Sequence, residues 1–269
     1  MIPGRPDNRA GWDAISAEYQ ERLGWPSDRL AWGIRCPFED ELQLLGDVSG
    51  LSALVLGCGG GQDIAALAKM GATRITGVDV SDRQLDHSRD FLLGEDVLSI
   101  TRLVHGSVED LRVIDDESID IAVSIHALNY VERADLCFAE THRVLRSDGL
   151  FAFSVQHPAD ASTHDEPPFG FDKPYFQVEC EWPWSGLAGD DARFRSYYRT
   201  VADWFDLLSS AGFMIERILE PRPSDDSAWL ETGWGLRDDF EKYATVPGTL
   251  IFVARKAGDS DVSRQGVER

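Results

Sequence analysis

The chain has 269 residues, 43% of them apolar, and a formal net charge of −21 at pH 7. This suffices for one large α/β domain, or a domain with an added lobe. Such acidity disfavours nucleic acid and anionic membranes as partners and suits neutral or cationic small molecules. The four cysteines lack the paired spacing of a zinc site or a disulfide framework, and we expect no metal. No signal peptide or apolar span of about 20 residues is evident, so we expect a cytoplasmic protein, monomeric or homodimeric.

The N-terminal region predicts two helices. Residues 9–23 have helical periodicity, with Trp12, Ile15 and Tyr19 on one stripe. Residues 39–45 form a second, shorter helix that leads to the first strand. Its apolar stripe allows the longer helix to pack on a sheet edge.

A strand, a glycine turn and a helix follow between Ser52 and Asp63. The apolar run 53–56 predicts a buried strand, and Gly57, Gly59 and Gly61 predict a tight turn. The helix that follows presents free N–H groups at its start, where an anion can bind. A glycine-rich turn alone is a weak signal, and we interpret Cys58 as a small residue that fits the turn.

A second strand, 72–79, ends on a carboxylate. Asp79 lies about 20 residues beyond the glycines, the spacing at which an acidic residue meets ribose hydroxyls in nucleotide-binding βαβ folds. The alternative is that Asp79 only caps the helix beginning near Ser81. Because the glycine turn precedes it, we favour ligand binding.

The glycine spacing argues against a dinucleotide. The expected last glycine or alanine of that fingerprint falls on Gln62 when counted from Gly57, and on Ile64 when counted from Gly59. No Lys-Ser or Lys-Thr pair follows, so the turn is not a P-loop either.

Alternating strands and helices continue along the chain and predict a parallel sheet. The predicted helices are 83–93, 136–145 and 200–211. The predicted strands are 98–104, 119–124, 150–155, 213–219 and 249–254. Ligands bind at the carboxyl ends of such strands, where Ser107 and Val108 lie; the alternative there is an ordinary turn.

Residues 156–199 are rich in aromatic side chains and lack a long periodic run. We predict that this insertion covers the site and shapes the substrate pocket, although the rings can equally hold an irregular lobe together. His157 leaves the fifth strand at its ligand-facing end. The tail, 257–269, is predicted to be disordered.

Five segments resemble, in order, the motifs of class I S-adenosylmethionine-dependent methyltransferases of the small-molecule type. They are 54–61 (LVLGCGGG), 77–81 (GVDVS), 106–111 (GSVEDL), 119–124 (IDIAVS) and 143–149 (RVLRSDG). The resemblance is close over about 47–153 and looser beyond. Val55 and Ser107 stand where the family usually has acidic residues, and Ser147-Asp148-Gly149 stands where it usually has Pro-Gly-Gly.

The resemblance implies a Rossmann-like, seven-stranded, mostly parallel sheet with helices on both faces. Residues 1–46 would form an N-terminal lid and 47–256 the methyltransferase domain, with 156–199 as the substrate-covering insertion.

The resemblance implies S-adenosylmethionine as the cofactor and transfer of its methyl group to a small molecule. The atom that is methylated can be oxygen, nitrogen or carbon. The expected cofactor-binding residues are Tyr19, Gly57, Cys58, Gly59, Gly61, Asp79, Val80, Ser107, Val108 and Ser124. His126 and His157 are the candidate catalytic residues, either of which can accept a proton from the acceptor. Two alternatives remain: a non-catalytic relative, which Val55 and Ser107 suggest, and an NAD-dependent oxidoreductase.

Overall fold

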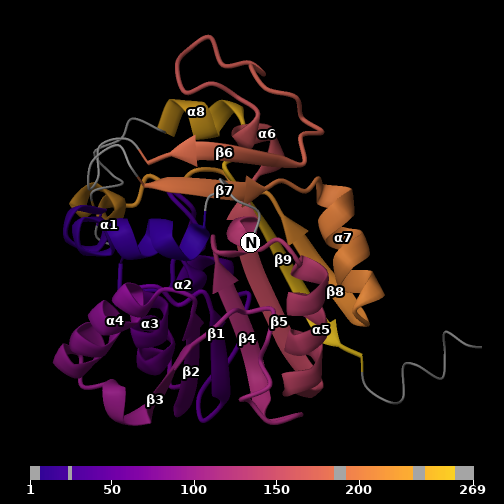
Figure 1. Cartoon of the computed structure of the whole chain (residues 1–269). Coiled ribbons are helices and arrows are strands. Elements are labelled where there is room, and N and C mark those ends of the chain that lie inside the picture. The colour runs from indigo at the N-terminus through magenta and orange to yellow at the C-terminus, as the bar shows by residue number, and fades with distance from the viewer. Residues whose placement is uncertain (1–6, 24–25, 185–191, 233–239, 258–269) are drawn as a thin grey trace, which may run out of the picture.

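The computed structural model describes residues 7–23, 26–184, 192–232 and 240–257 (Figure 1). In this part of the chain, a seven-stranded sheet lies between helices, and a two-stranded sheet crosses one end of it. The strands are β1 (Ser52–Leu56), β2 (Arg74–Asp79), β3 (Thr101–His105), β4 (Ile119–Ile125), β5 (Leu145–Gln156), β6 (Glu179–Pro183), β7 (Arg193–Tyr197), β8 (Phe213–Leu219) and β9 (Thr249–Lys256). The α-helices are α1 (Asn8–Leu23), α2 (Glu39–Leu42), α3 (Gln62–Lys69), α4 (Asp82–Gly94), α5 (Ala134–Val144), α6 (Pro158–Ala161), α7 (Val201–Ser210) and α8 (Phe240–Thr245). Short 3-10 helices are η1 (Leu98–Ile100), η2 (Leu128–Tyr130) and η3 (Ser227–Glu231).

The strand order of the large sheet is β3-β2-β1-β4-β5-β9-β8. Strands β1 to β5 are parallel, while β9 pairs antiparallel with both β5 and β8. The predicted mostly parallel sheet is therefore confirmed. The order changes direction between β1 and β4, and ligands of open α/β sheets bind in the crevice at such a point.

Apolar side chains cover both faces of the large sheet. On one face, Ile64 of α3 and Leu85 of α4 pack against the sheet together with residues of the 30–48 segment. On the other face, Phe138 of α5 and Trp204 of α7 pack against the sheet. Helices thus cover both faces, as predicted, and the edge at the carboxyl ends is left for a site.

A hairpin of β6 and β7 covers that edge. The two strands pair antiparallel from Glu179 with Tyr197 to Pro183 with Arg193. Arg195 on β7 forms ion pairs with Glu179 (2.7 Å) and Glu181 across the hairpin. Helix α1 contacts both β7 and α4, so it bridges the hairpin and the large sheet. The sequence predicted an aromatic insertion here but not this regular hairpin.

Two predicted strand boundaries were wrong. Residues 98–100 form η1 instead of the start of β3, because Thr101 Oγ1 and the Ile100 N–H both bond to the Val97 carbonyl and close a turn. Strand β5 begins at Leu145, five residues before the predicted start, since Leu145 pairs with Ile119 of β4. The predicted disordered tail lies outside the described residues except for Ala257.

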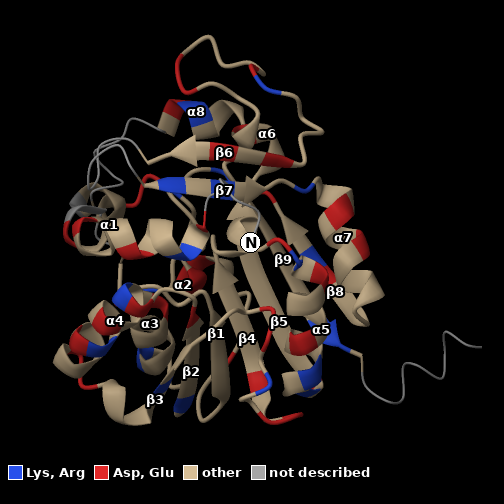
Figure 2. Cartoon of the chain, viewed as in Figure 1, with Lys and Arg blue, Asp and Glu red and all other residues tan. Residues whose placement is uncertain are grey.

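Charged residues are concentrated on helices and connections, whereas most of the large sheet carries uncharged residues (Figure 2). Within the described ranges, no helix has the length and apolarity needed to cross a lipid bilayer.

Candidate functional site

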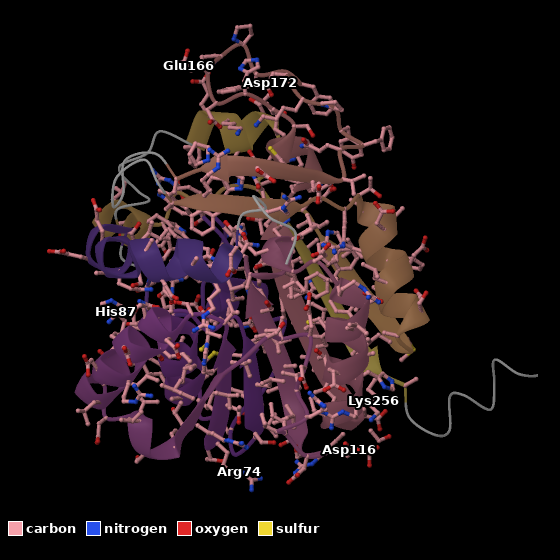
Figure 3. All side chains as sticks on the ribbon, in the orientation of Figure 1. Arg74, His87, Asp116, Glu166, Asp172 and Lys256 are labelled. Atoms are coloured by element: carbon pink, nitrogen blue, oxygen red, sulfur yellow. The ribbon has the colours of Figure 1, made fainter. Side chains whose placement is uncertain are left out.

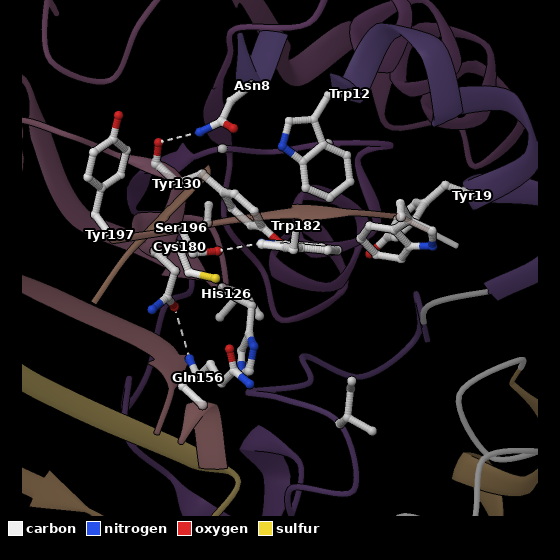
Figure 4. A pocket seen from close by; sticks show the side chains of 18 of the residues that line it. Asn8, Trp12, Tyr19, His126, Tyr130, Gln156, Cys180, Trp182, Ser196 and Tyr197 are labelled. Carbon is white, nitrogen blue, oxygen red and sulfur yellow. Dashed lines mark hydrogen bonds between the residues drawn. The ribbon is translucent and has the colours of Figure 1, made fainter. Parts of the chain in front are cut away.

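A cavity of about 1090 Å³ lies where the hairpin and α1 cover the carboxyl ends of the strands (Figure 4). Its lining includes most of the residues predicted from the sequence. These are Tyr19, Gly57, Cys58, Gly59, Asp79, Val80, Ser107, Val108 and His126. Segments far apart in the chain therefore converge on one space.

The glycine turn after β1 forms the floor of this cavity. Gly57 has φ +71°, and a Cβ there would lie 2.4 Å from the Ala127 Cβ. Gly59 has φ +49°, and a Cβ there would have no atom within 4 Å. The backbone at Gly57 is thus fixed by close packing, while Gly59 presents bare backbone to open space.

Asp79 is 8% exposed and holds the turn from the end of β2. Its Oδ2 accepts a hydrogen bond from the Gly59 N–H (2.9 Å), and its Oδ1 accepts one from the Ser81 N–H (2.9 Å). Burial raises the pKa of this carboxyl group, and the backbone hydrogen bonds partly offset the shift. Ser81 Oγ, not Asp79, caps α4 by accepting from the Gln84 N–H. The carboxylate therefore anchors the turn and still lines the cavity.

The turn after β3 lines the next part of the cavity. Ser107 Oγ accepts the Glu109 N–H (3.2 Å), and the Glu109 carboxylate accepts the Arg133 N–H (2.9 Å). The segment 107–109 is therefore held in place next to Asp79 and Val80, which line the same space.

Helix α1 closes one side with aromatic rings. Trp12 packs edge-to-face against Tyr19 and Tyr130, with ring centroids 5.4 and 5.2 Å apart. Trp184, next to the hairpin, packs against Tyr19 at 5.5 Å. Burial raises the pKa of the Tyr19 hydroxyl far above its usual range, so it stays protonated. Gln20 accepts from Gln62 of α3 (2.6 Å) and donates to Gln84 of α4 (2.8 Å), which fastens α1 over the glycine turn.

His126 lies at the carboxyl end of β4 with an unusual backbone. Its φ is +50°, and its N–H donates to the Ser154 carbonyl (3.0 Å). Its Nε2 lies 3.4 Å from Thr249 Oγ1. Burial lowers its pKa to about 4, so the imidazole is neutral near pH 7. A left-handed conformation in a non-glycine residue on a cavity wall is typical of functional sites.

The sequence and the fold are both similar to those of known methyltransferases. Residues 54–153 match the model of a methyltransferase domain. A solved S-adenosylmethionine-dependent methyltransferase from Mesorhizobium loti is 27% identical, with a TM-score of 0.62 over 80% of this chain and 94% of that one. These matches support the assignment of the chain to the class I S-adenosylmethionine-dependent methyltransferases.

Two curated relatives are methyltransferases as well. An uncharacterized methyltransferase of Bacillus subtilis is 37% identical over 111 residues, which are 41% of this chain and 42% of that protein. The 27-O-demethylrifamycin SV methyltransferase of Amycolatopsis mediterranei is 25% identical over 228 residues, which are 83% of this chain and 70% of that protein. The family and the enzyme class predicted from the sequence are thus confirmed.

S-adenosylmethionine is the cofactor of this methyltransferase family, and the residues here fit it. The open space above Gly59 leaves room for a ligand against bare backbone. Each Asp79 carboxylate oxygen has more than one lone-pair direction, so accepting one backbone N–H leaves it able to accept a ligand hydroxyl. Within the described residues, no three His, Cys, Asp or Glu side chains converge as metal ligands would.

Three residues predicted for the methyltransferase site do not line the cavity. Gly61, with φ +91°, is the N-cap of α3, where a Cβ would meet Ser88 Oγ at 2.6 Å. Ser124 is buried and donates to the Leu56 carbonyl (2.8 Å), which joins β4 to β1.

His157 is the third of these residues, and it caps a helix. Its Nδ1 accepts the Ala159 N–H (3.0 Å) at the start of α6, and its Nε2 lies 2.9 Å from Glu220 Oε1. The side chain is buried. This geometry favours a structural role for His157 and leaves His126 as the histidine on the cavity wall near the glycine turn.

Sequence reasoning missed several polar residues that line the methyltransferase cavity. They are Asp63, Glu109, Gln156, Asp160 and Lys242. The first three lie just after a glycine turn or at a strand end, a position that signals a ligand site. Nothing in the sequence pattern marks Asp160 and Lys242, which are brought together by α6 and α8.

Proposed function

We propose that this enzyme methylates a small, uncharged molecule whose reactive oxygen or nitrogen lies beside His126. The observation that carries the proposal is a neutral imidazole on the wall of one covered cavity, which also contains the glycine turn and Asp79. Ligand cavities commonly measure about 300–1,000 Å³, so a space of about 1090 Å³ has room for a cofactor and an acceptor together.

The cofactor would occupy the half of the cavity nearest β1 to β3. In this proposal Asp79 binds the ribose hydroxyls with charge-assisted hydrogen bonds. Gly57, Cys58 and Gly59 let the backbone approach the methionine part, while Val80, Ser107 and Val108 bound the base. Tyr19 closes the space from α1. S-adenosylmethionine, when bound, supplies an electrophilic methyl group.

The acceptor would occupy the half under the hairpin. Trp12, Tyr130 and Trp182 line this part, and Trp182 Nε1 donates to Ser196 Oγ (2.9 Å), which fixes the orientation of the ring (Figure 4). Rigid aromatic walls favour flat or apolar molecules and exclude water. The net charge of −21 disfavours an anionic acceptor.

His126 would orient the acceptor and receive its proton. A neutral imidazole accepts a hydrogen bond from a hydroxyl or an amine and directs a lone pair of that atom toward the methyl group. With a pKa lowered to about 4, it remains in this accepting form throughout the neutral range. The name of the Amycolatopsis relative, a methyltransferase of a 27-O-demethylated compound, supports an oxygen as the acceptor atom.

The test has two steps. Calorimetric titration of the protein with S-adenosylhomocysteine and NAD should give saturable binding of the first compound only. Transfer of labelled methyl from S-adenosylmethionine is then measured against a library of phenols, alcohols and amines, with anionic analogues included. The proposal would be supported if uncharged hydroxyls or amines are methylated and the His126→Gln substitution lowers the rate at least tenfold. Turnover restricted to anionic compounds, or unchanged in His126→Gln, would contradict it.

A further inference from the structure

A buried ion pair lies in the cavity wall, away from the cofactor half. Lys242 Nζ of α8 lies 2.7 Å from Asp160 Oδ1 of α6, and the two side chains are 6% and 4% exposed. Gln156, at the end of β5, donates from Nε2 to Asp160 Oδ2 (2.7 Å). All three residues line the cavity. We call Gln156, Asp160 and Lys242 the polar cluster.

Fold stability is a weak explanation for the polar cluster. Removing two charges from water costs several kcal/mol for each ion, and apolar side chains of similar size would often serve the fold equally well. This free-energy cost is more readily explained if the buried ion pair contacts a ligand. A buried charged group in a cleft is a functional-site signal for this reason.

The donors and acceptors of Lys242 define what it can bind. An ammonium group has three N–H donors. Asp165 Oδ1 accepts one of them (2.7 Å), and Asp160 Oδ1, also 2.7 Å from Nζ, forms the ion pair with the same ammonium group. Another N–H can meet an oxygen of a ligand. Two carboxylates already neutralise the lysine and leave one negative charge in excess, so a carbonyl or hydroxyl oxygen fits better than a carboxylate or phosphate.

The polar cluster is continuous with His126 through the sheet. Gln156 and Thr249 are partners in the β5–β9 ladder, and Thr249 Oγ1 lies 3.4 Å from His126 Nε2. A single acceptor molecule lying along this wall would contact the imidazole with one end and Lys242 with the other.

We propose that the polar cluster binds a neutral carbonyl or hydroxyl oxygen of the methyl acceptor, remote from the atom that is methylated. This inference rests on the proposed function and narrows the substrate class. The acceptor has an apolar or aromatic body, a nucleophilic group beside His126, and a second oxygen held by the Lys242 ammonium group.

A matched pair of compounds tests this directly. 4-Hydroxybenzophenone and 4-benzylphenol are both phenols with two rings, and they differ in a carbonyl or a methylene between the rings. Binding to the protein saturated with S-adenosylhomocysteine is measured by calorimetry. We expect the wild type to bind the carbonyl compound at least tenfold more tightly than the methylene compound.

The variant removes both charges together, because one buried charge left alone would destabilise the fold. Lys242→Met combined with Asp160→Asn should bind the two phenols within a factor of two of each other. The matched control is Lys256→Met with Glu117→Gln, which removes the ion pair between these residues (3.3 Å). Lys256 lies at the opposite end of the sheet from the loop carrying Glu166 and Asp172 (Figure 3), so this control should keep the tenfold preference.

The outcomes separate the two proposals. S-adenosylhomocysteine affinity within twofold of wild type in both double variants shows that they are folded and that the cofactor half is intact. Equal affinity of the wild type for the two phenols, saturable binding of neither, or a preference that survives in the Lys242→Met and Asp160→Asn double variant would overturn the inference. Failure of S-adenosylhomocysteine to bind the wild type would instead overturn the proposed function.

Discussion

The Asp79 carboxylate accepts the backbone N–H of Gly59 at 2.9 Å and so joins the end of β2 to the turn after β1. One side chain thereby fixes the conformation of the glycine turn and presents its remaining lone pairs to the cavity. The sequence offered ligand binding or helix capping for Asp79; the cap of α4 is Ser81, and the bond to Gly59 was not predicted.

The two glycines of the turn should respond differently to an added methyl group. Gly57→Ala places a Cβ 2.4 Å from Ala127 Cβ and should lower the free energy of unfolding by about 2 kcal/mol or more. Gly59→Ala meets no protein atom within 4 Å, so only its positive φ costs stability, about 1 kcal/mol. Its S-adenosylhomocysteine affinity should nevertheless fall at least tenfold. Thermal unfolding measures the stability and calorimetry the S-adenosylhomocysteine affinity. Wild-type affinity in Gly59→Ala would show that the ligand does not approach this glycine.

Asn8 should control how firmly α1 closes the cavity. Its Nδ2 donates to the carbonyls of Tyr130 (3.0 Å) and Arg195 (2.9 Å), and its Oδ1 accepts the Arg195 N–H (2.8 Å). Asn8→Ala should cost about 1–2 kcal/mol of stability and speed S-adenosylhomocysteine dissociation several-fold in stopped-flow measurements. The control is Glu21→Ala on the exposed side of the same helix. Equal dissociation rates in the two variants would show that these hydrogen bonds do not hold α1 closed.

The stability of the protein should carry a pH dependence from His126. Its pKa is about 4 in the folded state and about 6.5 when unfolded, so the unfolded chain binds the extra proton between these values. The contribution of the neutral His126 side chain to the unfolding free energy is therefore complete above about pH 6.5 and is lost as the pH falls toward 4. The difference in unfolding free energy between wild type and His126→Gln, measured by urea titration at several pH values, should shrink on acidification by about 1–3 kcal/mol. A difference that is constant from pH 7 to 4 would contradict the depressed pKa.

His157 should prove dispensable for chemistry. Because its ring caps α6 and meets Glu220, His157→Asn should lower the melting temperature. Methyl transfer to the first acceptor identified should stay within about threefold of wild type at a temperature where both are folded. A loss of 100-fold or more with unchanged S-adenosylhomocysteine affinity would return His157 to the list of catalytic candidates.

Local patterns were sufficient to predict most of the large sheet and most of the residues that line the cavity near the glycine turn. An apolar strand, a glycine turn and a helix are adjacent in the chain, and the carboxyl-end rule then places Asp79, Ser107 and Val108 near one another without knowledge of long-range contacts. The same rule did not place His157 on the cavity wall, since it locates a residue at the sheet edge but does not say which way its side chain points.

The part of the cavity under the hairpin, the proposed acceptor half, depends on contacts that the sequence pattern does not encode. Strands β6 and β7 pair with each other across a long connection, which no local pattern predicts. Only this pairing brings Arg195 next to Glu179 and Glu181. Lys242 follows Asp160 by more than eighty positions, and no periodicity relates α8 to α6. The proposed acceptor site thus lies where prediction from sequence is weakest.

The proposed contact between Asp79 and the ribose is the most direct point at which to test the cofactor assignment. Calorimetry of Asp79→Ala and Asp79→Asn with S-adenosylhomocysteine should show a loss of about 2 kcal/mol or more, a factor of about 30, in protein that still unfolds cooperatively. Undiminished affinity in a folded Asp79→Ala variant would contradict the placement of the nucleoside across the ends of β1 and β2.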